Sequence, residues 1–441
     1  MFKLPQKRKY CQQHKFFYVL LFLLVLSCSN VVSKSNWVFL IYLDADNDLA
    51  PTALADLEEM RIGSKSNNIE IYLQLDLPDG ITAKRYHIKN QKLTLLEDIG
   101  EVNMADGATL TEFLMWGKSK IKENNDHTIL ILSDHGNGWD QGIGPPSEKP
   151  TISDRSLFMD WDNGVNNVAL HNHKVREAIE AADINIDILG LDASIMGTIE
   201  ALYEFSSLAD ILISSQEVGE ASGWDYEYIF SRLSDNSAMS HEEFAKLVVE
   251  SYENYFENRF YPEKPVAFDQ RYTIAAHLSA NIPIIVSELN NIALVLRAGM
   301  ADDLLQNSLL EELDQARQNV QEIDKYNQFD VYIDIADFSQ FLSYDNELPQ
   351  LISDATIAEY HGKGRPNANG ISVVFFNPPD AWIYNTCDSH YKNWDGLTAT
   401  GNKGKFINET SWDEMLVQYY SLVIPSYDQI SENHVCNTLF E

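Results

Sequence analysis

The chain has 441 residues, of which 45% are hydrophobic and 11% are aromatic. This length and composition allow either one large α/β domain with additions or two to three domains. The formal net charge at pH 7 is −34, which disfavours nucleic acids and anionic membrane surfaces as partners. Cations and basic ligands are compatible with such a surface, although solvated acidic side chains without a partner account for most of the charge.

The amino terminus predicts a targeting segment rather than part of the fold. Residues 1–27 carry five basic and no acidic side chains, and the apolar segment 16–26 is too short to span a bilayer as a helix. Val25-Leu26-Ser27-Cys28 then resembles a bacterial lipobox in which Cys28 would be lipidated. Leu26 is uncommon directly before the small residue, so ordinary signal cleavage and secretion remain the alternative. In both cases we expect an exported protein that contacts a membrane only through a lipid anchor.

The chain has four cysteines, and their positions restrict its chemistry. Cys11 and Cys28 belong to the targeting region, whereas Cys387 and Cys436 lie near the end of the chain. The last two could form a disulfide in an oxidising compartment, but the sequence does not show whether they meet. Residues 29–386 contain no thiol at all.

Apolar runs alternate with helical patterns up to about residue 215. We predict buried strands over 37–43, 69–75, 128–133, 186–191 and 211–214, and a hairpin from 85–88 and 93–96. Helical patterns lie between them, including 110–121 and 170–182. This alternation indicates a mainly parallel sheet that is flanked by helices.

The pattern changes after residue 240. Ser240 and Glu243 predict a capping box that opens a helix to about residue 258. Further helical stripes and strand-like runs follow at 283–298, 302–325, 333–345, 273–277 and 371–376. We interpret 240–425 as helices and strands that are added to the same sheet or packed beside it.

Two predicted strands are followed by side chains that can take part in catalysis or in binding. The strand over 186–191 is followed by Asp192-Ala193-Ser194, and the strand over 128–133 by Asp134-His135-Gly136. The carboxyl edge of an open α/β sheet is where ligands bind, and neighbouring strands would place His135 and Ser194 side by side. Taken singly, Ser194 and Asp192 would more often cap a helix, and His135 would more often be a hydrogen-bonded loop residue.

Two further groups suggest metal sites but fit them poorly. The acids in Asp44-Ala45-Asp46-Asn47-Asp48 begin like a calcium loop, yet Leu49 and Ala55 occupy positions that an EF-hand reserves for Gly and Glu. We therefore favour capping of the helix that follows. His171 and His173 alternate at the start of a predicted helix, so we expect them to point to different faces rather than to bind one ion.

Several motifs, taken together, resemble the clostripain family of cysteine peptidases, which are relatives of the caspase and gingipain fold. The similarity spans about residues 36–425. The landmarks are Tyr42-Leu43-Asp44-Ala45-Asp46-Asn47-Asp48-Leu49, Asp56-Leu57-Glu58-Glu59-Met60, Ser133-Asp134-His135-Gly136-Asn137-Gly138-Trp139, Leu191-Asp192-Ala193-Ser194-Ile195-Met196-Gly197, Ser215-Gln216-Glu217, Gly223-Trp224-Asp225-Tyr226 and Asn369-Gly370-Ile371-Ser372.

The resemblance implies a caspase-like α/β fold with a mainly parallel sheet flanked by helices. On this interpretation 36–239 is the peptidase core, 240–425 is the C-terminal part of the same unit, with further helices and strands, and 426–441 is a tail. The family typically depends on calcium, whose ligands we cannot assign from this sequence, and no other cofactor is implied. Members are often cut between the two catalytic motifs after a basic residue.

The resemblance also implies roles for individual residues. His135 takes the position of the catalytic base, and position 194 takes that of the nucleophile. Asp192 is similar to the residue that helps to form an acidic pocket for the Arg or Lys before the scissile bond. The implied ligand is therefore a basic peptide or protein.

The sequence departs from the family at its central residue, because position 194 is Ser and not Cys. A thiol beside a histidine yields thiolate at neutral pH, whereas a hydroxyl stays protonated until attack. Lys149 in the loop between the motifs precedes Pro150, a poor bond for peptidases, which leaves Arg155-Ser156 as the candidate processing site. Our first hypothesis is an exported peptidase-fold protein that recognises Arg- or Lys-containing peptides and is catalytically impaired.

The alternative is an active endopeptidase that cleaves after Arg or Lys. It would be serine-dependent, with His135 as base and Asp134 or Asp44 as the acid that orients it, or a cysteine peptidase if Ser194 is an engineered replacement. A nucleotide-binding or nuclease module is disfavoured because the chain has neither a phosphate loop nor a basic surface.

Overall fold

The computed structural model describes residues 35–78, 80–122, 125–139, 157–159, 169–219, 222–260, 270–323, 332–378 and 404–424. The predicted targeting segment 1–27, with Cys28, lies outside these residues, and so do Cys387, Cys436 and the candidate processing site at Arg155. Those predictions stay predictions.

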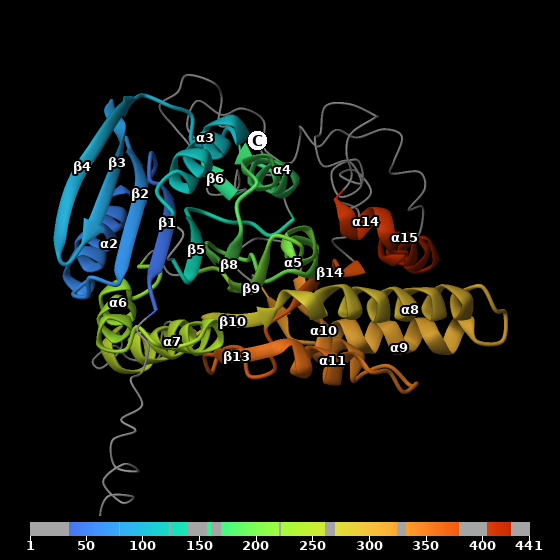
Figure 1. Cartoon of the computed structure of the whole chain (residues 1–441). Coiled ribbons are helices and arrows are strands. Elements are labelled where there is room, and N and C mark those ends of the chain that lie inside the picture. Colours follow the sequence, from blue (N-terminus) through green and yellow to red (C-terminus); the bar gives the residue numbers. More distant parts are fainter. Residues whose placement is uncertain are drawn as a thin grey trace, which may run out of the picture.

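A nine-stranded mixed sheet forms the centre of the molecule, with the order β13-β10-β9-β8-β5-β1-β2-β3-β4 (Figure 1). Its five central strands run parallel: β1 (Trp37–Asp44), β2 (Ile69–Leu77), β5 (His127–Ser133), β8 (Ile186–Asp192) and β9 (Ala209–Ser214). Antiparallel strands flank them, namely β3 (Ile81–Lys89), β4 (Lys92–Gly100), β10 (Thr273–Leu278) and β13 (Thr356–His361).

The central strands are mostly apolar because helices cover both faces of the sheet. All eight residues of β1 are buried, and successive side chains alternate between two hydrophobic cores. One core contains residues of α3 (Gly107–Lys118), α4 (Asn172–Ala182) and α5 (Ile199–Phe205). The other contains residues of α2 (Ala50–Gly63), α6 (Tyr226–Asp235) and α7 (His241–Asn254). This arrangement confirms the predicted fold class.

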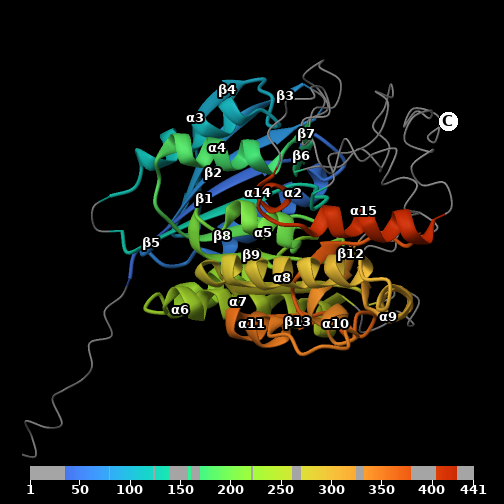
Figure 2. The same ribbon diagram turned by 90° about the vertical axis from the view of Figure 1, so that its right-hand side faces the viewer.

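The chain beyond α7 contributes both to the central sheet and to structure beside it. β10 and β13 extend the sheet, and β11 (Glu322–Ile323), β12 (Tyr332–Asp334) and β14 (Ser372–Val374) form a second, three-stranded sheet. The helices of this part are α8 (Ile282–Met300), α9 (Gln306–Asn319), α10 (Ile335–Ser339), α11 (Leu348–Ala355), α14 (Lys405–Glu409) and α15 (Trp412–Val423). Figure 2 shows α15 lying along α8.

Three shorter features complete the described structure. β6 (Leu157–Met159) pairs with β7 (Ala169–Leu170) in a two-stranded sheet. A π-helical turn, η1 (Tyr255–Phe260), continues α7, and a 3₁₀ turn, η2 (Ser279–Asn281), leads into α8. The predicted capping box of Ser240 and Glu243 is confirmed at the start of α7.

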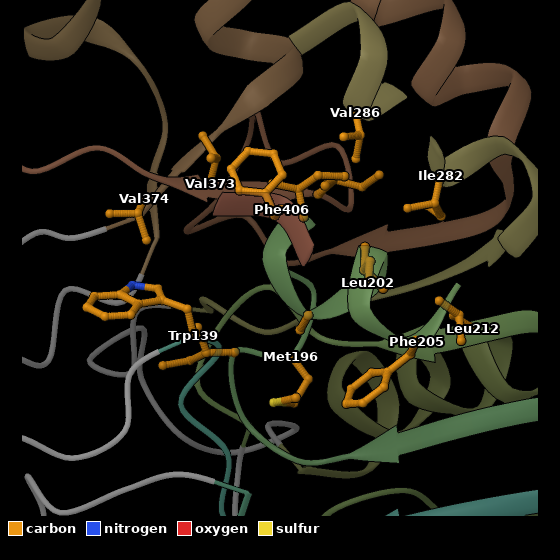
Figure 3. Packing of buried hydrophobic residues seen from close by; sticks show 14 of the residues in the cluster. Trp139, Met196, Leu202, Phe205, Leu212, Ile282, Val286, Val373, Val374 and Phe406 are labelled. Atoms are coloured by element: carbon orange, nitrogen blue, oxygen red, sulfur yellow. The ribbon is translucent and has the colours of Figure 1, made fainter. Parts of the chain in front are cut away.

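The helices and strands of the C-terminal part share one core with α5. Figure 3 shows Leu202 and Phe205 of α5 packed near Ile282 of α8, with Val373 of β14 and Phe406 of α14 in the same cluster. All five side chains are buried. Removing the C-terminal part would therefore expose the apolar face of α5, the helix that follows β8.

Polar contacts also tie the C-terminal part to the turn that follows β8. The Ser372 amide donates to the carbonyl oxygen of Gly197 over 2.9 Å. Gln216 Nε2 donates to Asp334 Oδ2 over 3.1 Å, and the Gly370 amide donates to Gln216 Oε1 over 2.8 Å. Residues of the C-terminal part therefore hold the loops after β8 and β9 in position.

One helical segment, Ser279–Met300, is long and apolar enough to cross a membrane by length and composition alone. Its residues Ile285, Leu289, Ile292 and Leu296 are buried in the core beside α5 and α15. One face of this apolar segment is therefore packed within the protein, whereas Ile284, Leu294 and Val295 are exposed.

Candidate active site

The structure brings His135 and Ser194 to the same edge of the sheet. β5 and β8 are neighbouring parallel strands, and Ser133 is the register partner of Asp192. His135 and Ser194 each lie two residues beyond these partners, and both line one cavity of about 270 Å³. The predicted juxtaposition of an imidazole and a hydroxyl at the carboxyl edge is thus observed.

Gly136 allows the two turns to approach each other. A Cβ atom at this position would lie 2.3 Å from the carbonyl oxygen of Ser194 and 3.0 Å from its nitrogen. Such contacts are well inside van der Waals distance, and the obstacle is backbone. The residue after His135 must therefore lack a side chain if Ser194 is to stay in place.

A strained turn presents Ser194. The next residue, Ile195, has a φ angle of +61°, which is unfavourable for a β-branched side chain. Its amide donates to the carbonyl oxygen of Glu217 over 3.1 Å, and the Gly197 amide donates to that of Ser215 over 2.6 Å. These bonds to the loop after β9 hold the turn in its unusual conformation.

The helix after β8 begins later than its apolar pattern suggests, and its cap is Thr198. The Thr198 side chain accepts a hydrogen bond from the Ala201 amide, and α5 begins at Ile199. The alternative that Ser194 or Asp192 caps this helix is therefore wrong. Both side chains are free of that task and face the cavity instead.

Ser194 Oγ accepts a hydrogen bond from the Gly219 amide over 3.0 Å. The described residues show no hydrogen bond between this hydroxyl and the His135 ring. The hydroxyl is half-buried, and the Gly219 amide fixes it on the side of the loop after β9.

The acid that contacts His135 is Asp48. His135 Nε2 lies 2.7 Å from Asp48 Oδ1, and the His135 side chain is 11% exposed while that of Asp48 is 60% exposed. The expectation that Asp134 or Asp44 orients the base is wrong. Asp134 Oδ1 instead accepts from Asn47 Nδ2 over 2.8 Å, and Asp44 Oδ1 accepts from the Asp46 amide over 3.2 Å.

The interpretation of the acids after β1 as helix caps is also wrong. The N-cap position of α2 is Leu49, which provides no side-chain cap. Asp48 reaches across to His135, while Asn47 Oδ1 accepts from the Leu49 amide over 2.9 Å. No sequence signal separates these roles, because an acid after a strand can cap, bind or orient equally well.

Asp192 lies at the cavity beside hydrogen-bond donors that hold its carboxylate in position. Tyr226 donates its hydroxyl to Asp192 Oδ2 over 2.7 Å, and the Trp224 amide lies 3.4 Å from the same oxygen. Burial raises the pKa of Asp192 to about 6, although both hydrogen bonds act in the opposite direction. Gly223 leaves room for this carboxylate, since a Cβ there would lie 2.9 Å from Oδ2.

Asp56 on α2 is a second carboxyl group of the same region, and no role was assigned to it from the sequence. It is 5% exposed and lines the cavity with Asp192. Burial, followed by repulsion from Asp192 and from Glu59, raises the pKa of Asp56 to about 9. At neutral pH, Asp56 therefore holds a proton, and a cation entering the cavity would favour its release.

The cavity carries a strongly acidic lining. Its aspartates come from the ends of β1, β5 and β8 and from α2, and no Lys or Arg belongs to the lining that the structure describes. The aspartates are Asp44, Asp48, Asp56, Asp134 and Asp192. Trp224 also lines it, as expected for a packing residue near the site, whereas Trp139 packs near Met196 (Figure 3). Such a cavity suits a cationic side chain.

The histidine pair at the start of α4 differs from expectation. His171 precedes the helix in an extended conformation, so its ring stacks on that of His173 with centroids 5.8 Å apart. The prediction that the two rings point to different faces is wrong. They nevertheless belong to no group of three potential metal ligands among the residues that the structure describes.

Comparisons with known proteins agree with this geometry. The clostripain of Hathewaya histolytica is 26% identical over 248 residues, which are 50% of this chain and 46% of that protein. The match thus spans about half the length of the curated relative.

Two solved structures share the fold. A secreted C11 cysteine protease from Bacteroides thetaiotaomicron, bound to an irreversible peptide inhibitor, has a TM-score of 0.62 and 16% identity, and the match covers 86% of this chain and all of that one. An inactive zymogen C11 protease from Parabacteroides distasonis has a TM-score of 0.57 and 17% identity over 78% and 92% of the two chains. The sequence model of the Clostripain family matches residues 41–420, so the chain belongs to the clostripain family.

Proposed function

We propose that this protein is an exported member of the clostripain family that binds peptides through an Arg or Lys side chain and hydrolyses them poorly. The observation that carries the proposal is the acidic cavity beside position 194, in which Asp192 is held by Tyr226. A serine occupies the position that carries the nucleophilic cysteine in the family motif.

The cavity supports recognition of a basic side chain by charge and by donor chemistry. Asp192 presents a carboxylate whose position is fixed by the Tyr226 hydroxyl, so little rearrangement is needed on binding. A guanidinium or ammonium group would pair with the Asp192 carboxylate and would favour release of the proton that Asp56 holds at neutral pH. A neutral side chain would provide neither interaction.

The arrangement of Ser194, His135 and Asp48 supports the proposal of poor hydrolysis. A serine hydroxyl must lose its proton during attack, and this requires a base that is aligned with it. Ser194 Oγ is hydrogen-bonded to the Gly219 amide, and the His135 ring to Asp48. The elements of a serine hydrolase lie close together, but the described structure does not join them by a hydrogen bond.

The second candidate is a working serine-dependent endopeptidase with the same specificity. The hydrogen bond between His135 and Asp48 favours it, because an acid behind the histidine is what a serine nucleophile needs. Asp48 is largely exposed, so solvent weakens its effect on the imidazole.

An assay of three variants separates the two candidates. The wild type, Ser194→Ala and Ser194→Cys are incubated with Arg and Lys ester and amide substrates, with calcium or with a chelator. We expect little or no turnover by the wild type and a gain of at least about 10³-fold for Ser194→Cys, since nucleophile identity controls most of the rate.

Turnover by the wild type that Ser194→Ala abolishes would instead establish the serine-dependent peptidase. If neither the wild type nor Ser194→Cys turns over, binding decides: a labelled Arg peptide that binds Ser194→Ala supports recognition without catalysis. If that peptide does not bind either, the proposal is wrong.

Calcium dependence and export complete the proposal and rest on the family resemblance. Asp44 and its register partner Asp76 supply carboxylates of the kind that calcium prefers, but they belong to no group of three potential ligands within 4.8 Å of one another among the described residues. We propose that the protein binds calcium without assigning its ligands, and a higher melting temperature in calcium than in chelator would test it. Mass spectrometry of the mature protein would test lipidation of Cys28.

A further inference from the structure

A second cluster of potential ligands lies at the opposite edge of the same two strands. His127 begins β5, Asp187 is the second residue of β8, and His241 is the first residue of α7. One ligand atom from each residue lies within 4.8 Å of the other two. Within the described part of the chain, this is the one group of at least three His, Cys, Asp or Glu side chains that meets this distance.

The ligand atoms converge on one point. His127 Nδ1 and His241 Nε2 face each other directly, and His241 Nε2 lies 3.7 Å from Asp187 Oδ1. Ligands held about 2.0–2.1 Å from a tetrahedral ion lie roughly 3.4 Å from one another. The three side chains are therefore spaced so that small rotations would place all of them around one ion.

Neighbouring groups hold two of the ligands in orientation. The Thr128 amide donates to Asp187 Oδ2 over 2.6 Å, which leaves Oδ1 directed at the histidines. The Trp37 indole lies against the His127 ring with centroids 4.0 Å apart, and its Nε1 donates to the Ser237 carbonyl oxygen over 2.9 Å. Outer contacts of this kind are typical of metal sites, where they fix ligand direction.

We propose that His127, Asp187 and His241 form a binding site for a divalent transition-metal ion such as zinc. Two imidazoles and one carboxylate suit zinc and its neighbours, whereas calcium and magnesium prefer oxygen ligands throughout. The side chains of His241 and Asp187 are 27% and 29% exposed, so an ion can enter from solvent and keep a water ligand.

The site would connect three elements of the fold. A bound ion would tie the start of α7 to β5 and β8, the strands that carry His135 and Ser194 at their other ends. The rise of β5 places the ion roughly 20 Å from the rim, so it would stabilise the fold and take no part in peptide chemistry.

Titration of the metal-free, untagged protein with Zn²⁺ tests the proposal. We expect binding with a micromolar or lower Kd and a rise of several degrees in melting temperature. His241→Gln and Asp187→Asn should each weaken binding at least about tenfold. Co²⁺ gives a direct readout of the ligands, because its visible absorption bands should appear with the wild type and disappear with His241→Gln.

His361→Gln is the matched control. His361 on β13 pairs with a single carboxylate, Glu359, at 2.8 Å, so its removal should leave zinc binding unchanged. Mg²⁺ should leave the melting temperature unchanged. Absence of zinc binding by the wild type would overturn the proposal, and so would unchanged zinc affinity in both His241→Gln and Asp187→Asn. If Asp187→Asn does not fold, the zinc affinity of His241→Gln alone decides, because the His241 side chain is partly exposed.

Discussion

The two ends of the cavity at the carboxyl edge are built differently. At the acidic end, Tyr226 and Trp224 hold the Asp192 carboxylate, Asp56 is buried beside it, and burial raises the pKa values of both carboxyl groups. At the catalytic end, His135 pairs with a largely exposed Asp48, and Ser194 is bonded to a loop amide.

The difference indicates which end of the cavity is structured for binding. Enclosing two carboxyl groups destabilises the native state unless a ligand compensates them, so the acidic end has a structure suited to binding. The catalytic end depends on a side chain that can be exchanged without altering the frame. Under the proposed function, recognition and hydrolysis would therefore be separable.

The largest effect on recognition is expected from Asp192→Asn. The change removes the ionised partner of a basic side chain and should weaken binding of a fluorescein-labelled Arg peptide at least roughly 30-fold, equivalent to about 2 kcal/mol. Fluorescence anisotropy measures it, and the same peptide with citrulline in place of Arg is the neutral control. Equal affinity for the two peptides would show that the acidic end does not distinguish a charged side chain from a neutral one.

Asp56→Asn should raise stability, and more so at higher pH. The native pKa of Asp56 is about 9 and the unfolded value is near 3.9, so the native state retains a proton that the unfolded state releases between these values. Wild-type stability therefore falls with rising pH, whereas Asn avoids that loss. Urea unfolding from pH 5 to pH 8 should show the difference widening by up to about 1.4 kcal/mol per pH unit. A constant difference would mean that Asp56 is ionised throughout.

Binding of the Arg peptide should itself depend on pH. The pKa of Asp192 is about 6, so its carboxylate is mostly ionised at pH 7 and mostly protonated at pH 5. Affinity should fall about tenfold between these values, because the neutral acid attracts the guanidinium weakly. The dependence should vanish in Asp192→Asn, and its persistence there would assign it to a group other than Asp192.

The smallest effect is expected from Asp48→Asn in the Ser194→Cys background. Asp48 is 60% exposed, so its hydrogen bond to His135 is screened by water and should change kcat by only a few fold. The peptide affinity should stay the same. A loss of several orders of magnitude would show that the catalytic end relies on its acid as serine hydrolases do, and would favour the second candidate function.

The sequence was informative wherever one local pattern determined the structure. Long apolar runs identified the central strands, because strands buried on both faces need apolar residues at most positions. The order of those strands then placed His135 beside Ser194. β13 was missed because Thr356–His361 is half-buried and mixes polar with apolar residues, as an edge strand can.

The missed site residues depend on contacts across the fold. Asp48 and Asp134 both follow a strand, and only the positions of the loops decide which of them reaches His135. Thr198 caps α5 because the turn at Ile195 delays the helix by several residues. The cluster of His127, Asp187 and His241 joins three separate elements, and the spacing of these residues along the chain does not predict a metal site.

The turn at Ile195 has a consequence for how such proteins diverge. Its backbone is held by the carbonyl oxygens of Glu217 and Ser215, and no side-chain atom of Ser194 takes part in those bonds. Position 194 is therefore displayed in the same place whether its terminal atom is oxygen or sulfur. The backbone that presents residue 194 is therefore compatible with either nucleophile, and it does not by itself indicate whether a member of this fold cleaves the peptides that it binds.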